Sequence, residues 1–239
     1  MVVIETRSCK LPGMPRTRRV FFPGLSVHVT HRGINRAAIF GDDLDREQFL
    51  LWFREAMTKY EIAIHGLTLM SNHYHAIVTP SRADALPNAM RDFGSRYTRY
   101  FNRRYGRIGT MWTGRYRGIP IGDEVYWLNC LRYIELNPLR AHMVNDPAEY
   151  LWSSYLHHAV RDAWPWLVDH GVYLALGRTP EERRRAFHML SGQALSETDL
   201  ARQRLAKQDR PATCPIAPVS EIVRPHSTPR SFQDDIACR

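Results

Sequence analysis

The sequence predicts an α+β fold built on an antiparallel sheet. Four short segments alternate apolar and polar residues as strands do, and amphipathic segments with helical periodicity separate them. The resulting order is β-α-β-β-α-β, with further helical segments after it. This order is that of the ferredoxin-like, split βαβ arrangement. We therefore expect a ferredoxin-like domain followed by a helical C-terminal extension.

The first strand and helix lie in residues 25–60. "LSVHVTHRG" (25–33) alternates as a strand, and Gly33 ends it. "DDLDREQFLLWFREAMTKY" (42–60) is predicted to be a helix, because acidic residues fill its first turn and apolar residues form one stripe.

The remaining elements of the predicted domain follow in order. They are strands at 62–70 and 74–80 joined by the turn Ser71-Asn72, a helix from about 83 to 104, a strand or hairpin at 110–121, and a helix at 123–137. Pro138 does not easily continue a helix, so the last one is expected to end at Asn137.

The C-terminal part is expected to be helical and then irregular. Residues 148–176 are aromatic enough to pack back on the domain, and two short helices follow at 179–190 and 196–207. Each begins with a capping signal, Thr179 with Glu182 and Ser196 with Asp199. The predicted divisions are a basic irregular N-terminal arm (1–24), the sheet domain (25–157), the helical extension (158–207) and a flexible, Pro-rich tail (208–239).

Composition favours a polyanionic partner in a reducing compartment. The formal net charge is +9, which suits nucleic acid first and an anionic membrane surface second. The four cysteines are far apart and form no zinc or disulfide pattern. Because no signal peptide and no membrane-length apolar run is present, we expect a cytoplasmic protein without membrane contact.

Two histidines two residues apart, His73 and His75, occur in "LMSNHYHAIV" (69–78). On a strand both imidazoles project from one face and Tyr74 from the other, so the pair could bind a divalent metal ion. For the tripeptide alone, two histidines on an ordinary half-exposed strand are the favoured explanation.

A tyrosine and an asparagine in "LRYIELNPLRAHMV" (131–144) could complete such a site. Tyr133 and Asn137 are four residues apart, so a helix places them on one face. Tyr133 could then be a nucleophile and Asn137 an oxygen ligand for the metal. Alternatively, Tyr133 is a core aromatic and Asn137 a helix cap.

Residues 88–117 form a basic segment with eight arginines and one acidic residue. The fork of the guanidinium group suits phosphates and base edges. Aromatic residues between the arginines, among them Trp112, could stack on unpaired bases. A solvated helix face is the simpler explanation, but this composition favours nucleic acid.

These segments together resemble a known family. "HVTHRGINRAAIF", "LMSNHYHAIVTP", "SRYTRYFNRRYGRIGTMWTGRYR", "YWLNCLRYIELNPLRAHMV" and "WSSY" are similar, in this order, to the signature of single-tyrosine HUH transposases, and within them to the REP-associated tyrosine transposases of bacteria. The resemblance covers roughly residues 20–157.

The resemblance implies roles for particular residues. His73, His75 and Asn137 would hold Mg²⁺ or Mn²⁺, although imidazole also suits Zn²⁺. Tyr133 would be the nucleophile. The residues expected to contact DNA are Arg32, Arg96, Arg99, Arg103, Arg104, Arg115, Arg117 and Trp112.

The activity implied is metal-dependent cleavage and strand transfer of single-stranded DNA at hairpin-forming palindromic repeats, through a 5′-phosphotyrosine. A phenol with a pKa near 10 is a poor nucleophile at neutral pH, so the metal would stabilise the developing charge. The expected setting is the bacterial cytoplasm at the nucleoid, as a monomer or homodimer.

Three other interpretations stay open at this point. A replication initiator or relaxase shares the histidine pair but is not expected to contain "YIELNP". A non-catalytic DNA-binding regulator could use the same scaffold. A basic globular protein with a purely structural histidine pair would bind a palindromic hairpin no better than random single strands.

Overall fold

The structure, a computed structural model, describes residues 21–194 of the 239-residue chain. The chain divides into two compact units, 1–208 and 209–239, and the described residues all belong to the first. Most of the predicted N-terminal arm, the predicted helix at 196–207 and the predicted tail lie outside the described residues.

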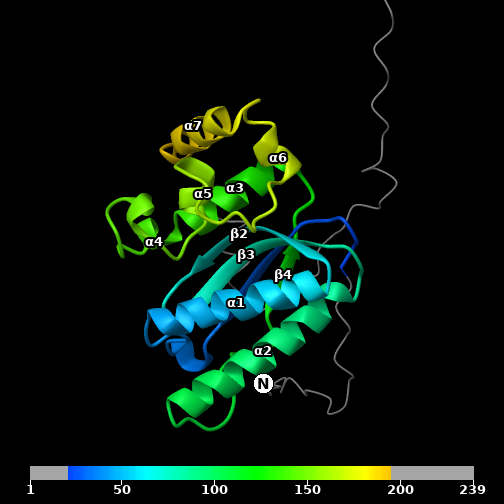
Figure 1. Cartoon of the computed structure of the whole chain (residues 1–239), viewed down its shortest axis with the longest axis vertical. Coiled ribbons are helices and arrows are strands. Elements are labelled where there is room, and N and C mark those ends of the chain that lie inside the picture. Colours follow the sequence, from blue (N-terminus) through cyan, green and yellow to red (C-terminus); the bar gives the residue numbers. More distant parts are fainter. Residues whose placement is uncertain (1–20, 195–239) are drawn as a thin grey trace, which may run out of the picture. The chain divides into compact units, whose positions relative to one another are not determined.

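A four-stranded antiparallel sheet forms the centre of this unit (Figure 1). Its strands are β1 (Val27–Arg32), β2 (Ile62–Leu69), β3 (His73–Pro80) and β4 (Arg117–Pro120), in the spatial order β2-β3-β1-β4. With the connections β1-α1-β2 and β3-α2-β4, this is the predicted ferredoxin-like topology. The strand or hairpin predicted at 110–121 is shorter than expected, with β4 at its end and one isolated bridge from Gly33 to Trp112 before it.

Helices α1 (Asp43–Lys59) and α2 (Ala85–Arg104) cover one face of the sheet (Figure 1). Asp42 caps α1 by accepting a hydrogen bond from the Asp45 backbone N–H, as acidic residues at a helix start favour. Phe49 of α1 and Phe93 of α2 meet at a ring-centroid distance of 4.7 Å over the sheet. Aromatic rings therefore fill the core between these two helices and the sheet.

Helix α3 (Glu124–Glu135) packs on the opposite face, which we call the α3 face (Figure 1). Gly66 of β2 permits the close approach, because a Cβ atom there would lie 2.5 Å from Leu131 Cδ1. The predicted end at Asn137 was wrong in detail: α3 ends at Glu135, and α4 (Asn137–Arg140) begins at once. Pro138 fits there because the first turn of a helix needs no N–H from it.

The segments after residue 144 pack back on the domain, as the aromatic content predicted. They comprise a 3₁₀ turn (Pro147–Glu149), α5 (Tyr155–Ala159), α6 (Gly171–Leu174) and α7 (Pro180–Ser191). Phe187 of α7 is fully buried, and the predicted capping box of Thr179 and Glu182 is present. The predicted boundaries at 24, 157 and 207 stay predictions, although α5 spans the one at 157.

Within residues 21–194, no helix combines the length and the apolar character needed to cross a bilayer. Cys130, the cysteine in this range, is buried.

Candidate functional site

The histidine pair lies on the α3 face of β3. The rings of His73 and His75 are 5.0 Å apart between centroids and nearly perpendicular. Tyr74 is fully buried on the other face, against Phe49 and Phe53 of α1. The alternation predicted from the sequence is therefore confirmed.

Neighbouring side chains hold the Nδ1 atom of each histidine. Nδ1 of His73 lies 2.7 Å from Oδ1 of Asn72, and Nδ1 of His75 lies 2.9 Å from Nε2 of His28 on β1. An amide oxygen only accepts, so the proton of neutral His73 is on Nδ1 and its lone pair is on Nε2. If His28 accepts in the same way, His75 also has its lone pair on Nε2. The Nε2 atoms of His73 and His75 are thus the nitrogens whose lone pairs could bind a metal ion.

Tyr133 meets this pair from above the sheet. Its ring lies 6.1 Å from that of His75 and perpendicular to it, and the Arg140 guanidinium lies 4.6 Å from the ring centroid. Tyr133 is 1% exposed and Asn137 is 7% exposed. Among the described residues, the buried Nδ2 of Asn137 has no hydrogen-bond partner. The amide is therefore not fixed by such a bond, and it can turn its oxygen inward.

This donor set fits a divalent cation. Two imidazoles with oriented Nε2 atoms and one amide oxygen suit Mn²⁺ or Zn²⁺, and with water ligands also Mg²⁺. The structure thus brings His73, His75 and Tyr133 together and buries Asn137 in the short helix that follows α3.

Two of the predicted DNA-contacting arginines lie beside the histidines. In the sheet register Arg32 is opposite His73, and Arg117 is opposite Thr30, which is itself opposite His75. Opposed residues of an antiparallel pair project from the same face, so Arg32 and Arg117 lie on the α3 face. Arg115 is exposed in the loop that leads into β4.

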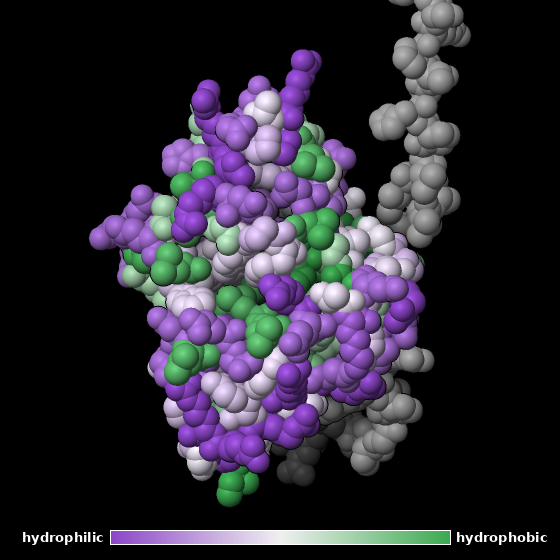
Figure 2. All heavy atoms as spheres, in the orientation of Figure 1, coloured by the Kyte–Doolittle hydropathy of each residue, from purple (hydrophilic) through white to green (hydrophobic). Residues whose placement is uncertain are grey.

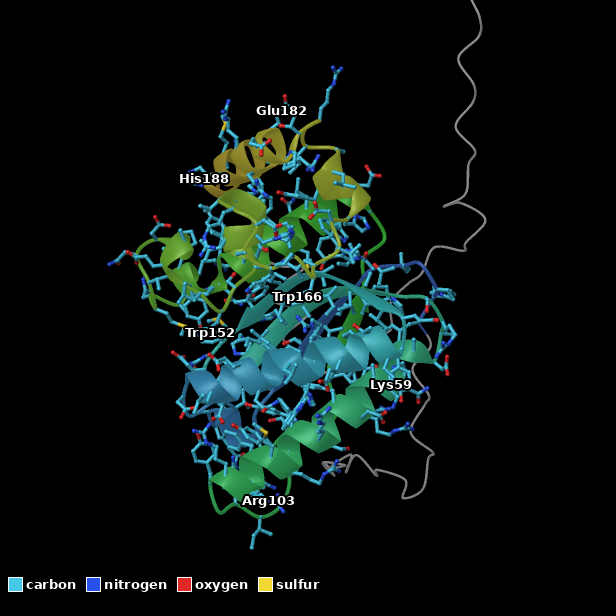
Figure 3. All side chains as sticks on the ribbon, viewed as in Figure 1. Lys59, Arg103, Trp152, Trp166, Glu182 and His188 are labelled. Atoms are coloured by element: carbon cyan, nitrogen blue, oxygen red, sulfur yellow. The ribbon has the colours of Figure 1, made fainter. Side chains whose placement is uncertain are left out.

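The arginines of α2 lie on the other side of the sheet. Arg99 and Arg103 are exposed, and Figure 3 shows Arg103 projecting away from the protein at the end of α2. Hydrophilic side chains gather over this end of the molecule (Figure 2). Arg96 makes an ion pair of 2.6 Å with Glu55 and lies over the Trp52 ring. The basic helix and the tyrosine therefore do not share one surface.

Arg104 links two helices, and its predicted contact with DNA stays a prediction. Its guanidinium binds both carboxylate oxygens of Asp42 and also Asp45, tying the end of α2 to the start of α1. Burial alone would raise the pKa of Asp45, but hydrogen bonds from Gly41 N–H, Tyr105, Tyr100 and Arg104 outweigh it and lower that pKa.

Trp112 is largely buried in the protein. It is 7% exposed, and His31 stacks on its ring at 4.2 Å. Stacking of a base on this ring stays a prediction and would require the ring to become uncovered. The sequence supplied the aromatic residue but not the side of the sheet on which it lies.

Comparison with known proteins bears on this site. Residues 22–137, the segment with the sheet, α3 and Asn137, match the family described as IS200-like transposases. The matching segment makes up just under half of the chain. No curated protein sequence matches the chain.

Solved structures are also similar to this chain. A REP-associated tyrosine transposase bound to a REP hairpin matches with a TM-score of 0.50 and 17% identity, over 66% of this chain and 93% of that one. A candidate transposase from Deinococcus radiodurans R1 matches with a TM-score of 0.35 and 14% identity, over 55% and 97%. A tRNA(His) guanylyltransferase from Saccharomyces cerevisiae has a TM-score of 0.31 and 16% identity, over 56% and 72%.

Proposed function

We propose that the protein cleaves and rejoins single-stranded DNA at hairpin-forming palindromic repeats, using Tyr133 and a divalent metal ion. The observation that carries this proposal is the perpendicular contact of Tyr133 with His75, whose Nδ1 is held by His28. A structural histidine pair needs neither the oriented Nε2 atoms nor a tyrosine from another element directly over them.

The reaction has a balanced course. The Tyr133 hydroxyl gives up its proton as its oxygen attacks a backbone phosphorus, the new O–P bond forms, and the bond from phosphorus to the 3′ oxygen breaks. The 3′ oxygen takes up a proton, and the 5′ phosphate stays on Tyr133 as a phosphodiester. Attack by a 3′-OH on this linkage reverses the step and joins strands without an external energy source.

Other residues would bind the metal ion and the DNA. His73, His75 and Asn137 would hold Mg²⁺ or Mn²⁺, which would withdraw charge from the attacked phosphate. Arg32 and Arg117 would contact the neighbouring phosphates. Because Tyr133 is 1% exposed, strand entry requires the groups that cover it to move aside.

Support for the substrate comes from charge and from the structural relative. The net charge of +9 suits a polyanion. The REP-associated tyrosine transposase with the same fold is bound to a REP hairpin. On this basis we assign a palindromic hairpin with a single-stranded flank as the substrate.

A denaturing gel with mass analysis tests the proposal. The protein is incubated with a hairpin-flanked single-stranded oligonucleotide and Mn²⁺. We expect a 5′-linked adduct on Tyr133, and we expect the Tyr133→Phe variant to bind the oligonucleotide equally well and to form no adduct. Tyr126→Phe, a change of a nearby tyrosine on α3, is the matched control and should still form it.

The alternative is a non-catalytic DNA-binding regulator on the same scaffold. It predicts equal hairpin binding by the wild type and by Tyr133→Phe, with no adduct from either protein at any Mg²⁺ or Mn²⁺ concentration. That outcome would contradict our proposal and support the regulator.

A further inference from the structure

A second group of metal-ligating side chains lies beyond the proposed DNA site, on the α5 side of α3. His157 and His158 belong to α5, and Asp169 precedes α6. One potential ligand atom from each of the three lies within 4.8 Å of the other two.

One pair of atoms in this group lies farther apart than the partners of an ordinary hydrogen bond. Nε2 of His157 and Oδ1 of Asp169 are 3.4 Å apart. An ordinary N–H···O hydrogen bond is about 2.9 Å long. Two ligands on a tetrahedral zinc ion with bonds of about 2.0–2.1 Å are separated by about 3.3–3.4 Å. The two atoms are therefore at the separation that a shared tetrahedral ion requires.

A buried carboxylate orients the second histidine. Nδ1 of His158 donates to Oε1 of Glu135 at 2.7 Å, and the Ser154 hydroxyl donates to the same oxygen. Glu135 is 0% exposed at the end of α3. When a carboxylate accepts a hydrogen bond from Nδ1–H of a histidine, Nε2 is the nitrogen left to bind a metal. This is the usual support of a metal-binding imidazole.

The charges around the histidines also favour a cation. In addition to Glu135 and Asp169, the carboxylate of Asp162 is nearby: it lies 3.2 Å from Nδ1 of His157. Among the described residues, Oε2 of Glu135 has no hydrogen-bond partner. A buried carboxylate oxygen without a hydrogen bond is costly, and a nearby divalent ion would offset that cost.

We propose that His157, His158 and Asp169 bind a divalent transition-metal ion of the zinc class. This ion would hold residues 155–170 against the side of α3 that faces α5. The ligand types fit, because imidazole nitrogens and one carboxylate are common zinc donors. Through His158 and Glu135 the ion would stabilise the helix that carries Tyr133. This site is separate from the proposed catalytic pair and does not depend on DNA cleavage.

The test uses the full chain with His73→Ala and His75→Ala, so that the proposed catalytic site does not contribute. The chelator-treated protein is titrated with Co²⁺, whose visible absorption reports a tetrahedral site, and then with competing Zn²⁺. We expect one saturable equivalent, and we expect Zn²⁺ to raise the melting temperature. In the same background, His157→Gln and Asp169→Asn should each weaken binding at least tenfold.

His188→Gln is the matched control, since His188 is an exposed histidine on α7 outside the group. It should bind Co²⁺ as the background protein does. Circular dichroism establishes that each variant is folded, and the partly exposed Asp169 is the milder of the two changes. Absence of a saturable Co²⁺ signal, or equal binding by His157→Gln and Asp169→Asn, would overturn the proposal and leave the group as a hydrogen-bonded cluster.

Discussion

At the scale of single residues, His28 is the informative addition to the histidine pair. It is 1% exposed and lies on β1, the strand next to β3, where its Nε2 atom contacts Nδ1 of His75. A metal-binding imidazole depends on such a partner for its tautomer and its ring orientation. We therefore assign His28 to positioning His75 rather than to contacting DNA.

The corresponding prediction concerns the metal dependence of cleavage. His28→Ala should raise the Mn²⁺ concentration for half-maximal adduct formation by about 10- to 100-fold, the usual loss when an outer-shell partner is removed. Hairpin affinity should be unchanged. His28→Asn should restore part of the effect, because its amide oxygen can accept from Nδ1–H. An unchanged Mn²⁺ dependence in His28→Ala would contradict the role.

The sequence identified the residues of the site better than it identified their partners. His73 and His75 could be recognised because period-two alternation fixes the face of two residues on one strand. His28 could not, because its contact depends on the register between β1 and β3. The burial of Trp112 could not be predicted for a similar reason, since its neighbours in sequence say nothing of the side on which it is buried.

At the scale of elements, the contact of α3 with β2 sets the height of Tyr133 above the sheet. Gly66 lies at an irregularity of the β2–β3 register and directly under Leu131, which is fully buried. A side chain at residue 66 would have to push Leu131 or the whole helix outward. The position of Tyr133 thus depends on a glycine in a strand where apolar β-branched residues are otherwise favoured.

Gly66→Ala should therefore lower both stability and cleavage. The overpacked contact should reduce the free energy of unfolding by about 1–3 kcal/mol. Urea unfolding measures this loss, and adduct formation per folded molecule should fall as well.

The double variant Gly66→Ala/Leu131→Ala provides the control. Leu131→Ala alone should cost about 2–5 kcal/mol because it leaves a cavity. The double variant should be more stable than the sum of the two losses implies, because the new methyl group occupies part of that space. Strict additivity would show that the two side chains do not compete.

Elements with their own signals were predicted closely, and those that depend on distant partners were not. The helix expected at 42–60 is Asp43–Lys59, because its cap and stripe are local. The strand expected at 110–121 is reduced to β4, because only four residues find a partner in β1. The break between α3 and α4 at Leu136 likewise has no signal apart from Pro138.

At the scale of the whole molecule, a chain of hydrogen bonds joins α3, the sheet and the C-terminal segments. Trp127 Nε1–H donates to Ser26, the hydroxyls of Ser26 and Thr79 are 2.8 Å apart, and Thr79 is 2.8 Å from Nε2 of His65. Nδ1 of His65 lies 2.6 Å from the Val168 carbonyl, to which it donates. Every donor in this chain finds an acceptor when His65 is neutral and Thr79 donates to it.

Acid should weaken the fold through His65. Burial lowers its pKa from 6.5 to about 4. The folded protein then binds the proton less readily than the unfolded chain does. The contribution is complete above pH 6.5 and is lost as the pH falls toward 4, up to about 3 kcal/mol. Urea unfolding between pH 7 and 4 measures it, and His65→Gln should show a shallower dependence. The same dependence in both proteins would exclude His65 as its source.

The distribution of arginines over the two faces of the sheet leads to the last prediction. Arg32 and Arg117 lie on the α3 face with Tyr133, whereas Arg99 and Arg103 lie on α2 across the sheet. A strand bound at Tyr133 can reach the first pair directly. It reaches the second pair only if it wraps around the edge of the domain.

We expect Arg32→Ala/Arg117→Ala to weaken hairpin binding at least tenfold at 0.1 M salt and to slow adduct formation. Loss of two phosphate contacts should reduce the slope of log affinity against log salt by about 1.4 for a single strand. Arg99→Ala/Arg103→Ala is the charge-matched control and should leave adduct formation unchanged. If this control abolished cleavage and the first variant did not, DNA would have to follow the α2 surface, as the arginine-rich sequence alone suggested.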